Sequence, residues 1–393
     1  MSSPNQTNTN SLPFLLTGIP GLEDLHIWFS IPFCFMYIMT LLGNTMILLA
    51  VRLDKSLHEP MYYFISMLAV IDLIFSTAVV PKLLGVFWLG SREIVSEACF
   101  IQMFFIHTST AVESGVLLAM SFDRYIAICN PLRYSTILTS SRTTQIGLLS
   151  LARGAAVMTP LMCLLTSLPY CESRVIPHSY CEHMAVVKLA CADPSVSDLY
   201  SIIVATLLVG TDSVFITLSY GMILRSVLRL PSQEARLKAL STCGSHICII
   251  LLFYIGGLLS MYLQMFSFGL APHVQVLVAD FYLTVPPMLN PFIYGLKVKQ
   301  IRRGIFRLLE KLAGLVFSHA YKGRRDAQRQ LRRFSLNTFK KLNVLPAVRG
   351  PKLNTVLKVQ PHQHRMHREN GYEHSGYVLA MSIEVRQQKK CLP

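Results

Sequence analysis

The chain has 393 residues, of which 52% are hydrophobic and only 15% are charged, and its mean hydropathy is +0.45. A soluble domain carries roughly a quarter charged residues, so this composition excludes a soluble domain and favours a membrane protein. The net charge of +15 is uneven, because residues 1–296 carry 14 basic against 16 acidic side chains, whereas residues 297–393 carry 22 against 5. We therefore expect anionic lipid or acidic protein surfaces, and no nucleic acid, as partners of the C-terminal quarter.

Seven apolar stretches are each long enough to cross about 30 Å of hydrocarbon. Their approximate cores are residues 27–51, 61–81, 99–122, 144–166, 199–224, 239–265 and 274–296. The first 26 residues contain neither Lys nor Arg, and basic residues gather in the connections after the first, third and fifth stretch. This asymmetry predicts an extracellular N-terminus (1–26), a cytoplasmic C-terminus and a multi-pass protein of the plasma membrane. The expected fold class is an all-α membrane protein with a seven-transmembrane helix bundle over residues 27–297.

The predicted extracellular side carries two kinds of modification site. The tripeptide Asn5-Gln6-Thr7 is a glycosylation acceptor pattern, and the predicted topology places Asn5 outside the cell. Four cysteines also fall on this oxidising side, namely Cys99, Cys171, Cys181 and Cys191. Four cysteines allow three pairings, and the residues alone do not choose among them.

Four carboxylic side chains fall inside the predicted spans, at Asp72, Glu113, Asp212 and Asp280. A carboxylate facing lipid is costly, so each should face the bundle interior with a partner or be protonated. Asp72 and Glu113 form a candidate sodium site with Asn290, because oxygen ligands from neighbouring helices suit a hard cation. The alternative is one carboxylic acid hydrogen-bonded to its neighbour. No cofactor is expected.

The third stretch carries further polar side chains. His107 lies on its outer half, at a depth that suits a ligand pocket open to the outside, although an interior His that satisfies a hydrogen bond is the commoner case. Asp123 and Arg124 mark the inner end of the stretch. Taken alone, this dipeptide predicts a helix-end ion pair worth less than about 1 kcal/mol.

The segment after the seventh stretch divides into two parts. Residues 298–312 place apolar side chains at helical spacing and basic ones on the other face, which predicts a short amphipathic helix on the inner membrane surface. Residues 313–393 are polar, basic and poorly periodic. We therefore expect a long, mostly disordered cytoplasmic tail that contacts membrane lipid.

Six sequence motifs occur in order along the seven stretches. They are Gly43-Asn44, Leu57–Tyr62 (Leu-His-Glu-Pro-Met-Tyr), Met120–Cys129 (Met-Ser-Phe-Asp-Arg-Tyr-Ile-Ala-Ile-Cys), Ser219-Tyr220, Lys238–His246 (Lys-Ala-Leu-Ser-Thr-Cys-Gly-Ser-His) and Pro287–Gly295 (Pro-Met-Leu-Asn-Pro-Phe-Ile-Tyr-Gly). With them, residues 12–312 resemble an olfactory receptor of the rhodopsin-like, class A G protein-coupled receptors. The N-terminal Gly18–Glu23 and the long second outer loop further resemble the class I, or fish-like, branch.

The resemblance implies disulfide pairs and an activation switch. It pairs Cys99 with Cys181 and Cys171 with Cys191. It also implies that Arg124 locks the inactive state and meets a stimulatory G protein, which raises cyclic AMP, when the sixth span swings outward. The implied activation residues are Asp123, Arg124, Tyr125, Tyr220, His246, Asn290 and Tyr294.

The depth of residues along the spans predicts the lining of an odorant pocket, which should be mostly apolar with a few polar groups. The expected residues are His107, Thr110, Ala111, Val204, Ala205, Leu208, Tyr254, Leu258, Met261, Asp280 and Thr284. Class I receptors that bind carboxylates often carry an Arg near the outer end of the sixth span, where this chain has Gln264 and Met265. We therefore expect a neutral ligand, or less favourably an amine that pairs with Asp280.

Other classes of function fit the sequence less well. No catalytic constellation is recognisable, so we do not expect an enzyme. A transporter should show paired broken helices or a charged pathway, and the few acids here do not form one. The remaining alternative is a class A receptor for a non-odorant metabolite outside the olfactory epithelium, which the sequence does not distinguish from an odorant receptor.

Overall fold

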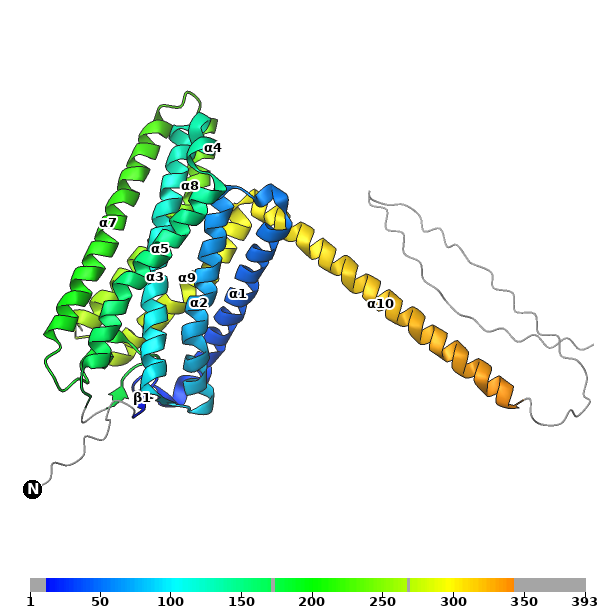
Figure 1. The fold of residues 1–393 in the computed structure, drawn as a ribbon, viewed down its shortest axis with the longest axis horizontal. Coiled ribbons are helices and arrows are strands. Elements are labelled where there is room, and N and C mark those ends of the chain that lie inside the picture. Colours follow the sequence, from blue (N-terminus) through cyan, green and yellow to red (C-terminus); the bar gives the residue numbers. More distant parts are fainter. Residues whose placement is uncertain (1–11, 171–173, 267–268, 343–393) are drawn as a thin grey trace, which may run out of the picture. The chain divides into compact units, whose positions relative to one another are not determined.

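The computed structural model describes residues 12–170, 174–266 and 269–342. Seven of its helices are long and apolar enough to cross a membrane, which confirms the seven predicted stretches. These are α1 (His26–Leu53), α2 (Pro60–Leu89), α3 (Ser96–Cys129), α5 (Ser140–Ser167), α7 (Ser195–Leu228), α8 (Gln233–Phe266) and α9 (Pro272–Lys297). They form a bundle (Figure 1). The bundle belongs to the first of two units of the chain, which ends at Gly323 in the sequence.

Short elements close the two ends of the bundle (Figure 1). One end, called here the β1 end, carries the strands β1 (Phe14–Leu16), β2 (Glu93–Ile94) and β3 (Val175–Ile176), the turn η2 (Glu23–Leu25) and the helix α6 (His183–Val187). The opposite end, called the α4 end, carries η3 (Lys55–Leu57), η4 (Pro131–Arg133) and α4 (Tyr134–Ile137).

A three-stranded sheet holds the N-terminal segment against the loop between α5 and α7. β1 is the central strand, antiparallel to β2 with Phe14 opposite Ile94 and parallel to β3 with Leu16 opposite Ile176. All four side chains are buried. The ring of Phe14 also meets Tyr170 edge-on at a centroid distance of 5.3 Å. Apolar burial therefore fixes the start of this loop over the bundle.

A disulfide fixes the middle of the same loop. Cys99 at the start of α3 is bonded to Cys181 in the loop, which confirms that implied pair. The side-chain carbonyl of Gln102 also accepts a hydrogen bond from the amide of Cys181 at 2.9 Å. The other implied pair, Cys171 with Cys191, includes Cys171, which lies outside the described residues, as does the predicted glycosylation site Asn5.

The motif Gly43-Asn44 on α1 has a physical explanation in its contact with α9. Pro291 has no N–H, so the carbonyl of Pro287, one turn earlier in α9, loses its usual helical partner. The side-chain amide of Asn44 donates a hydrogen bond to this carbonyl at 3.1 Å. A Cβ at position 43 would lie 2.7 Å from the ring of Pro291, so only glycine permits this approach. The proline in α9 is thus accommodated by its neighbour, as is common in membrane helices.

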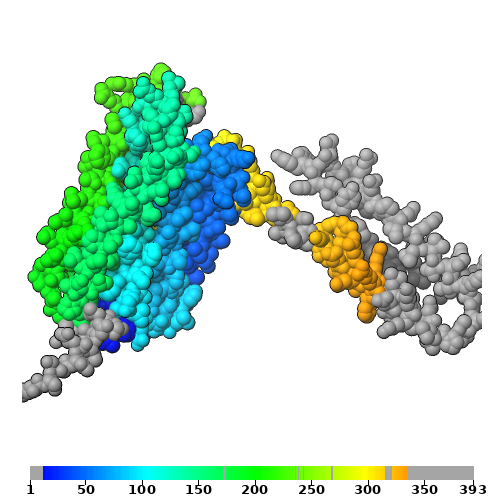
Figure 2. Space-filling model, in the orientation of Figure 1, coloured from blue at the N-terminus to red at the C-terminus, as the bar shows by residue number. Residues whose placement is uncertain are grey.

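The outer surface of the bundle is apolar. On α7, Leu207 and Phe215 are 59% and 57% exposed, and Leu149 on α5 is 68% exposed. In Figure 2 the side chains of α2, α3 and α5 fill the spaces between these helices on the face that is shown. A packed interior with apolar side chains turned outward suits hydrocarbon as the solvent. The chain is therefore a multi-pass membrane protein.

The last described helix, α10 (Lys299–Leu342), is longer than predicted. The sequence predicted an amphipathic helix that ends at residue 312 and a disordered tail from residue 313, whereas the helix continues for 30 residues beyond that point. Residues 313–342 contain no proline and are rich in Arg, Lys, Gln, Leu and Ala, which favour helix even without a regular apolar stripe. The part of the predicted tail over 343–393 lies outside the described residues.

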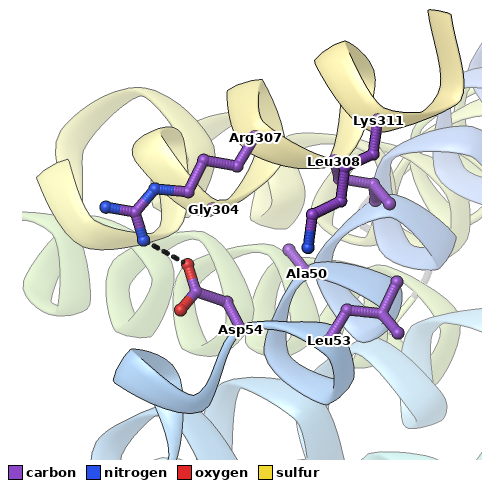
Figure 3. A pocket seen from close by; sticks show the side chains of 7 residues that line it. All are labelled: Ala50, Leu53, Asp54, Gly304, Arg307, Leu308 and Lys311. Atoms are coloured by element: carbon purple, nitrogen blue, oxygen red, sulfur yellow. Dashed lines mark hydrogen bonds and ion pairs between the residues drawn. The ribbon is translucent and has the colours of Figure 1, made fainter. Parts of the chain in front are cut away.

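The first turns of α10 pack against the α4 end of α1. The guanidinium of Arg307 contacts the carboxylate of Asp54 at 2.9 Å. Hydrogen bonds from the hydroxyl and amide of Ser56, together with Arg307, lower the pKa of Asp54. A Cβ at Gly304 would lie 2.8 Å from Leu57, so this glycine allows close packing. Figure 3 shows the small pocket of about 120 Å³ at this junction, lined by Ala50, Leu53, Asp54, Gly304, Arg307, Leu308 and Lys311.

Candidate functional site

A cavity of about 260 Å³ lies inside the bundle, among α3, α5, α7, α8, α9 and the loop that follows Cys181. Its described lining is mostly apolar, as expected for a pocket that takes small organic molecules. The structure brings together on this lining all the predicted residues of the third, fifth and sixth spans. These are His107, Thr110, Ala111, Val204, Ala205, Leu208, Tyr254, Leu258 and Met261.

The two predicted residues of the seventh span do not line this cavity in the part of the chain that the structure describes. Asp280 is fully buried, and it accepts a hydrogen bond from the hydroxyl of Ser179 in the α5–α7 loop. Thr284 donates to the main-chain carbonyl of Asp280 at 2.8 Å. Tyr180 and Leu283 line the cavity in their place. Both residues lie on a face of α9 that is turned away from the described lining, so the expected contact of an amine with Asp280 has no support in this geometry.

The loop and the start of α7 contribute polar lining residues that sequence reasoning missed, namely Glu182, His183 and Asp198. Glu182 and His183 follow Cys181, whose disulfide draws the loop over the cavity, and this proximity was the available signal. The ring of His183 meets that of His107 edge-on, with centroids 5.9 Å apart. Burial lowers the pKa of His183, although Glu182 and Asp198 act to raise it. Because burial is the larger effect, the imidazole is neutral at pH 7.

A buried ion pair lies beneath the cavity and joins four helices. The guanidinium of Arg153 on α5 donates to both carboxylate oxygens of Asp212 on α7, at 2.8 and 2.7 Å. The hydroxyl of Ser114 on α3 also donates to Asp212, at 2.6 Å, and lies 2.9 Å from the hydroxyl of Tyr254 on α8. Ser114 and Tyr254 line the cavity. The sequence required a partner for Asp212 but did not identify Arg153.

A second polar cluster contains the candidate sodium ligands. The side-chain amide nitrogen of Asn290 lies 3.1 Å from both carboxylate oxygens of Asp72. One carboxylate oxygen of Glu113 and the amide oxygen of Asn290 are buried, and neither has a hydrogen-bond partner among the described residues. Buried oxygen atoms of this kind fit a hard cation, so the residues present fit a sodium site, which stays a prediction.

The Asp123-Arg124 dipeptide near the end of α3 is held by α4. The side chain of Asp123 is fully buried, and it accepts hydrogen bonds from Arg124 Nε at 2.9 Å and from the hydroxyl of Tyr134 at 2.7 Å. Burial, followed by the charge of Asp123, raises the pKa of Tyr134. Close by in the bundle, the hydroxyl of Tyr220 on α7 lies 2.5 Å from Nδ1 of His246 on α8. Both contacts fix helices of the α4 end in one arrangement.

The remaining predicted switch residues have other partners. Tyr294 is buried, and its hydroxyl donates to the sulfur of Met120 at 3.8 Å rather than to Tyr220. Tyr125 packs against the buried pair Ile223 and Val227 of α7. The structure therefore shows an arrangement in which the third and seventh spans are joined through Met120.

Comparison with known proteins identifies the family. The family model for olfactory receptors matches residues 33–311. The chain belongs to the olfactory receptor family. Human Olfactory receptor 52K2 is 53% identical over 305 residues, which cover 78% of this chain and 97% of that receptor. Human Olfactory receptor 52K1 is 51% identical over 311 residues (79% and 99%), and human Olfactory receptor 51G2 is 50% identical over 299 residues (76% and 95%).

Membership of this family makes the chain a G protein-coupled receptor and not an enzyme, as the sequence predicted. The matched residues include the whole described lining of the receptor's cavity and the contacts of Arg124, Tyr220 and His246. The continuation of α10 beyond residue 311 lies outside the family match. The receptor thus combines a family bundle with a C-terminal helix that needs its own explanation.

Proposed function

We propose that this receptor binds a small organic odorant in the cavity and activates a stimulatory G protein at the α4 end, which raises cyclic AMP. The observation that supports the proposal is that polar residues of the cavity lining belong to a hydrogen-bonded network between helices. Ser114 and Tyr254 line the cavity; Ser114 is hydrogen-bonded to Asp212 of the Arg153–Asp212 pair, and Tyr254 is hydrogen-bonded to Ser114. A ligand that touches them therefore contacts a network that joins α3, α5, α7 and α8. A ligand that binds one arrangement of these helices better than another shifts the equilibrium between them.

The proposed ligand is neutral rather than a carboxylate. No Lys or Arg occurs among the described residues that line the cavity, whereas Glu182 and Asp198 are acidic. The nearby guanidinium of Arg153 already donates to Asp212. A carboxylate would therefore enter a desolvated site without a counter-charge, which is strongly unfavourable.

The proposed output runs through Arg124. In the present arrangement its guanidinium is paired with Asp123, while the Tyr220–His246 contact holds α7 to α8. Movement of α8 away from α7 breaks the second contact and opens the α4 end. Arg124 is then free to leave Asp123 and contact the G protein.

We place the receptor in the plasma membrane. The β1 end lies outside the cell, and the α4 end lies in the cytoplasm. Two observations support this topology: the basic residues gather in the connections at the α4 end, and the Cys99–Cys181 disulfide at the β1 end suits an oxidising compartment. On this topology Asn5 is available for glycosylation, and Cys171 can pair with Cys191.

Two further partners are proposed. Sodium binds among Asp72, Glu113 and Asn290. If so, replacing NaCl by choline chloride should raise agonist potency in the native receptor but not in Glu113→Gln. Membrane lipid binds α10, where Phe306 and Leu309 are 60% and 47% exposed and the basic residues Arg303, Arg307 and Lys311 lie along the adjoining face of the helix. Replacing both apolar residues by Ser should lower retention of the receptor's surface pool relative to an equivalent double Ser variant of the basic face.

The proposal is tested by a cyclic AMP screen of a broad odorant panel on the full chain. We expect one or more neutral compounds to raise cyclic AMP, and the response to vanish in Arg124→Ala at equal surface labelling. Arg92→Ala is the matched control, because this exposed arginine lies at the β1 end. A full response in Arg124→Ala would contradict the proposed output, and acids more potent than matched neutral compounds would contradict the proposed ligand class.

A further inference from the structure

Two residues that line the cavity, on different elements, each carry a buried polar atom without a hydrogen-bond partner among the described residues. His183 lies in α6 of the loop and is 6% exposed, and its Nε2 has no hydrogen-bond partner among the described residues. Asp198 lies in the first turn of α7, and its Oδ1 is likewise buried and without a hydrogen bond in the described part of the chain. Both residues line the cavity.

Such atoms need an explanation, because most buried polar groups in proteins are hydrogen-bonded and an unpaired one destabilises the fold. The neighbouring acid differs in this respect, since a carboxylate oxygen of Glu182 accepts the amide of Ala185 at 2.6 Å and caps α6. The unpaired atoms of His183 and Asp198, in contrast, belong to residues that line the cavity, so an occupant of the cavity is the partner that we consider for them.

The two atoms set different demands on an occupant. The unpaired carboxyl oxygen of Asp198 requires a hydrogen-bond donor. The buried imidazole of His183 is neutral, because desolvation lowers its pKa, and its Nε2 then accepts or donates depending on the tautomer. His107, whose ring edge contacts His183, lies beside it on α3.

We propose that Asp198 and His183 form the subsite for the ligand's head group, and that this head group is a hydroxyl. A hydroxyl donates to Asp198 Oδ1 and can still accept from, or donate to, His183 Nε2. An aldehyde, ketone or ether has no proton to donate and leaves Asp198 unpaired. A carboxylate places a second anion beside Asp198. The inference rests on the proposed function and narrows its neutral ligand to an alcohol.

The experiment compares straight-chain alcohols, from hexanol to decanol, with the methyl ether, aldehyde and carboxylic acid of the same chain, using cyclic AMP in cells that express the full receptor. In the native receptor, we expect the best alcohol to be at least about tenfold more potent than its methyl ether, because a site that hydrogen-bonds a hydroxyl discriminates against analogues that lack it. This comparison needs no variant, so it does not depend on how well a mutant folds.

Asp198→Asn then tests the residue itself. The amide nitrogen donates to a carbonyl while the amide oxygen still accepts from a hydroxyl, so we expect the potency advantage of the alcohol over the aldehyde to shrink by about tenfold or more. General damage to the fold weakens both compounds and does not produce this change. Asp24→Asn is the control, because Asp24 is an exposed acid in η2 away from the cavity. His183→Phe should weaken alcohols without improving aldehydes.

Equal potency of alcohol and methyl ether in the native receptor would overturn the proposal, as would an unchanged alcohol preference in Asp198→Asn. Activation by neutral aldehydes or esters in preference to alcohols overturns the hydroxyl subsite but leaves the proposed odorant function intact. If no compound of any class changes cyclic AMP at normal surface labelling, the proposed function itself fails.

Discussion

The Arg153–Asp212 pair gives the most demanding test of how this receptor is held together. The side chain of Asp212 is 2% exposed and that of Arg153 is 33% exposed, and both lie within membrane-spanning helices, away from bulk water. Removing one partner of a buried ion pair costs about 3–5 kcal/mol, because the other charge is left unpaired. We expect the lower end, about 3 kcal/mol, for Asp212→Leu or Arg153→Met, because each remaining charge keeps one polar neighbour: Ser114 donates to Asp212, and the carbonyl of Ala111 accepts from Arg153.

The assay is thermal unfolding of the purified receptor in detergent, read by a thiol-reactive or tryptophan probe. A loss of about 3 kcal/mol should lower the apparent Tm by roughly 6 °C, at about 2 °C per kcal/mol for a chain of this size. The double variant Asp212→Leu/Arg153→Met leaves no unpaired charge, so its Tm should lie above that of either single variant. The reasoning is refuted if each single variant unfolds within about 1 °C of the native receptor, or if the double variant loses the sum of both.

Three further predictions concern contacts elsewhere in the bundle. Gly43→Ala should lower surface expression several-fold, because the added Cβ would lie 2.7 Å from Pro291. Gly85→Ala is the control and should express normally, because a Cβ there meets nothing within 4 Å. Equal expression of the two variants would contradict the packing argument. Tyr134→Phe removes the 2.7 Å hydrogen bond to Asp123 and should raise basal cyclic AMP about fivefold, as expected for a loss of about 1 kcal/mol. An unchanged basal level would show that this hydrogen bond does not hold the resting state. Cys99→Ser should abolish surface expression, because it removes the disulfide to Cys181. Cys163→Ser changes an exposed free cysteine and should leave surface expression unchanged. Normal surface expression of Cys99→Ser would show that the fold does not need this disulfide.

The sequence predicted the bundle well because hydrocarbon imposes a simple rule on it. Each span must be about 20 apolar residues long and helical, so the run from His26 to Leu53 is visible without any tertiary information. The same rule made Asp72 and Asp212 conspicuous as charges that need partners. The sequence also grouped Asp72 with Asn290, because oxygen ligands from neighbouring helices suit one cation, and the two side chains are hydrogen-bonded in the structure.

Tertiary details were less predictable. Arg153 is the one basic residue of the fourth predicted span, but only the crossing of α5 and α7 places it against Asp212. Asp280 was assigned to the pocket by its depth, but a rotation about the axis of α9 turns it toward Ser179. His183 lines the cavity because a disulfide folds the loop over it, and Asp198 lines it because the first turn of α7 lies there; no periodicity in the sequence reveals either. The length of α10 was missed because helix propensity, rather than an apolar stripe, carries it past residue 312.

The central claim is that ligands act from the cavity, and filling the cavity tests it most directly. Ala205 on α7 lines the cavity, whereas the next residue, Thr206, is exposed on the outer face of the same helix. The measurement is the cyclic AMP dose–response of Ala205→Phe and Thr206→Phe to the best agonist, at matched surface labelling. The account predicts that Ala205→Phe loses about a hundredfold or more in potency, as expected for a bulky ring in a cavity of about 260 Å³, while Thr206→Phe keeps the native response. An unchanged response in Ala205→Phe would contradict it.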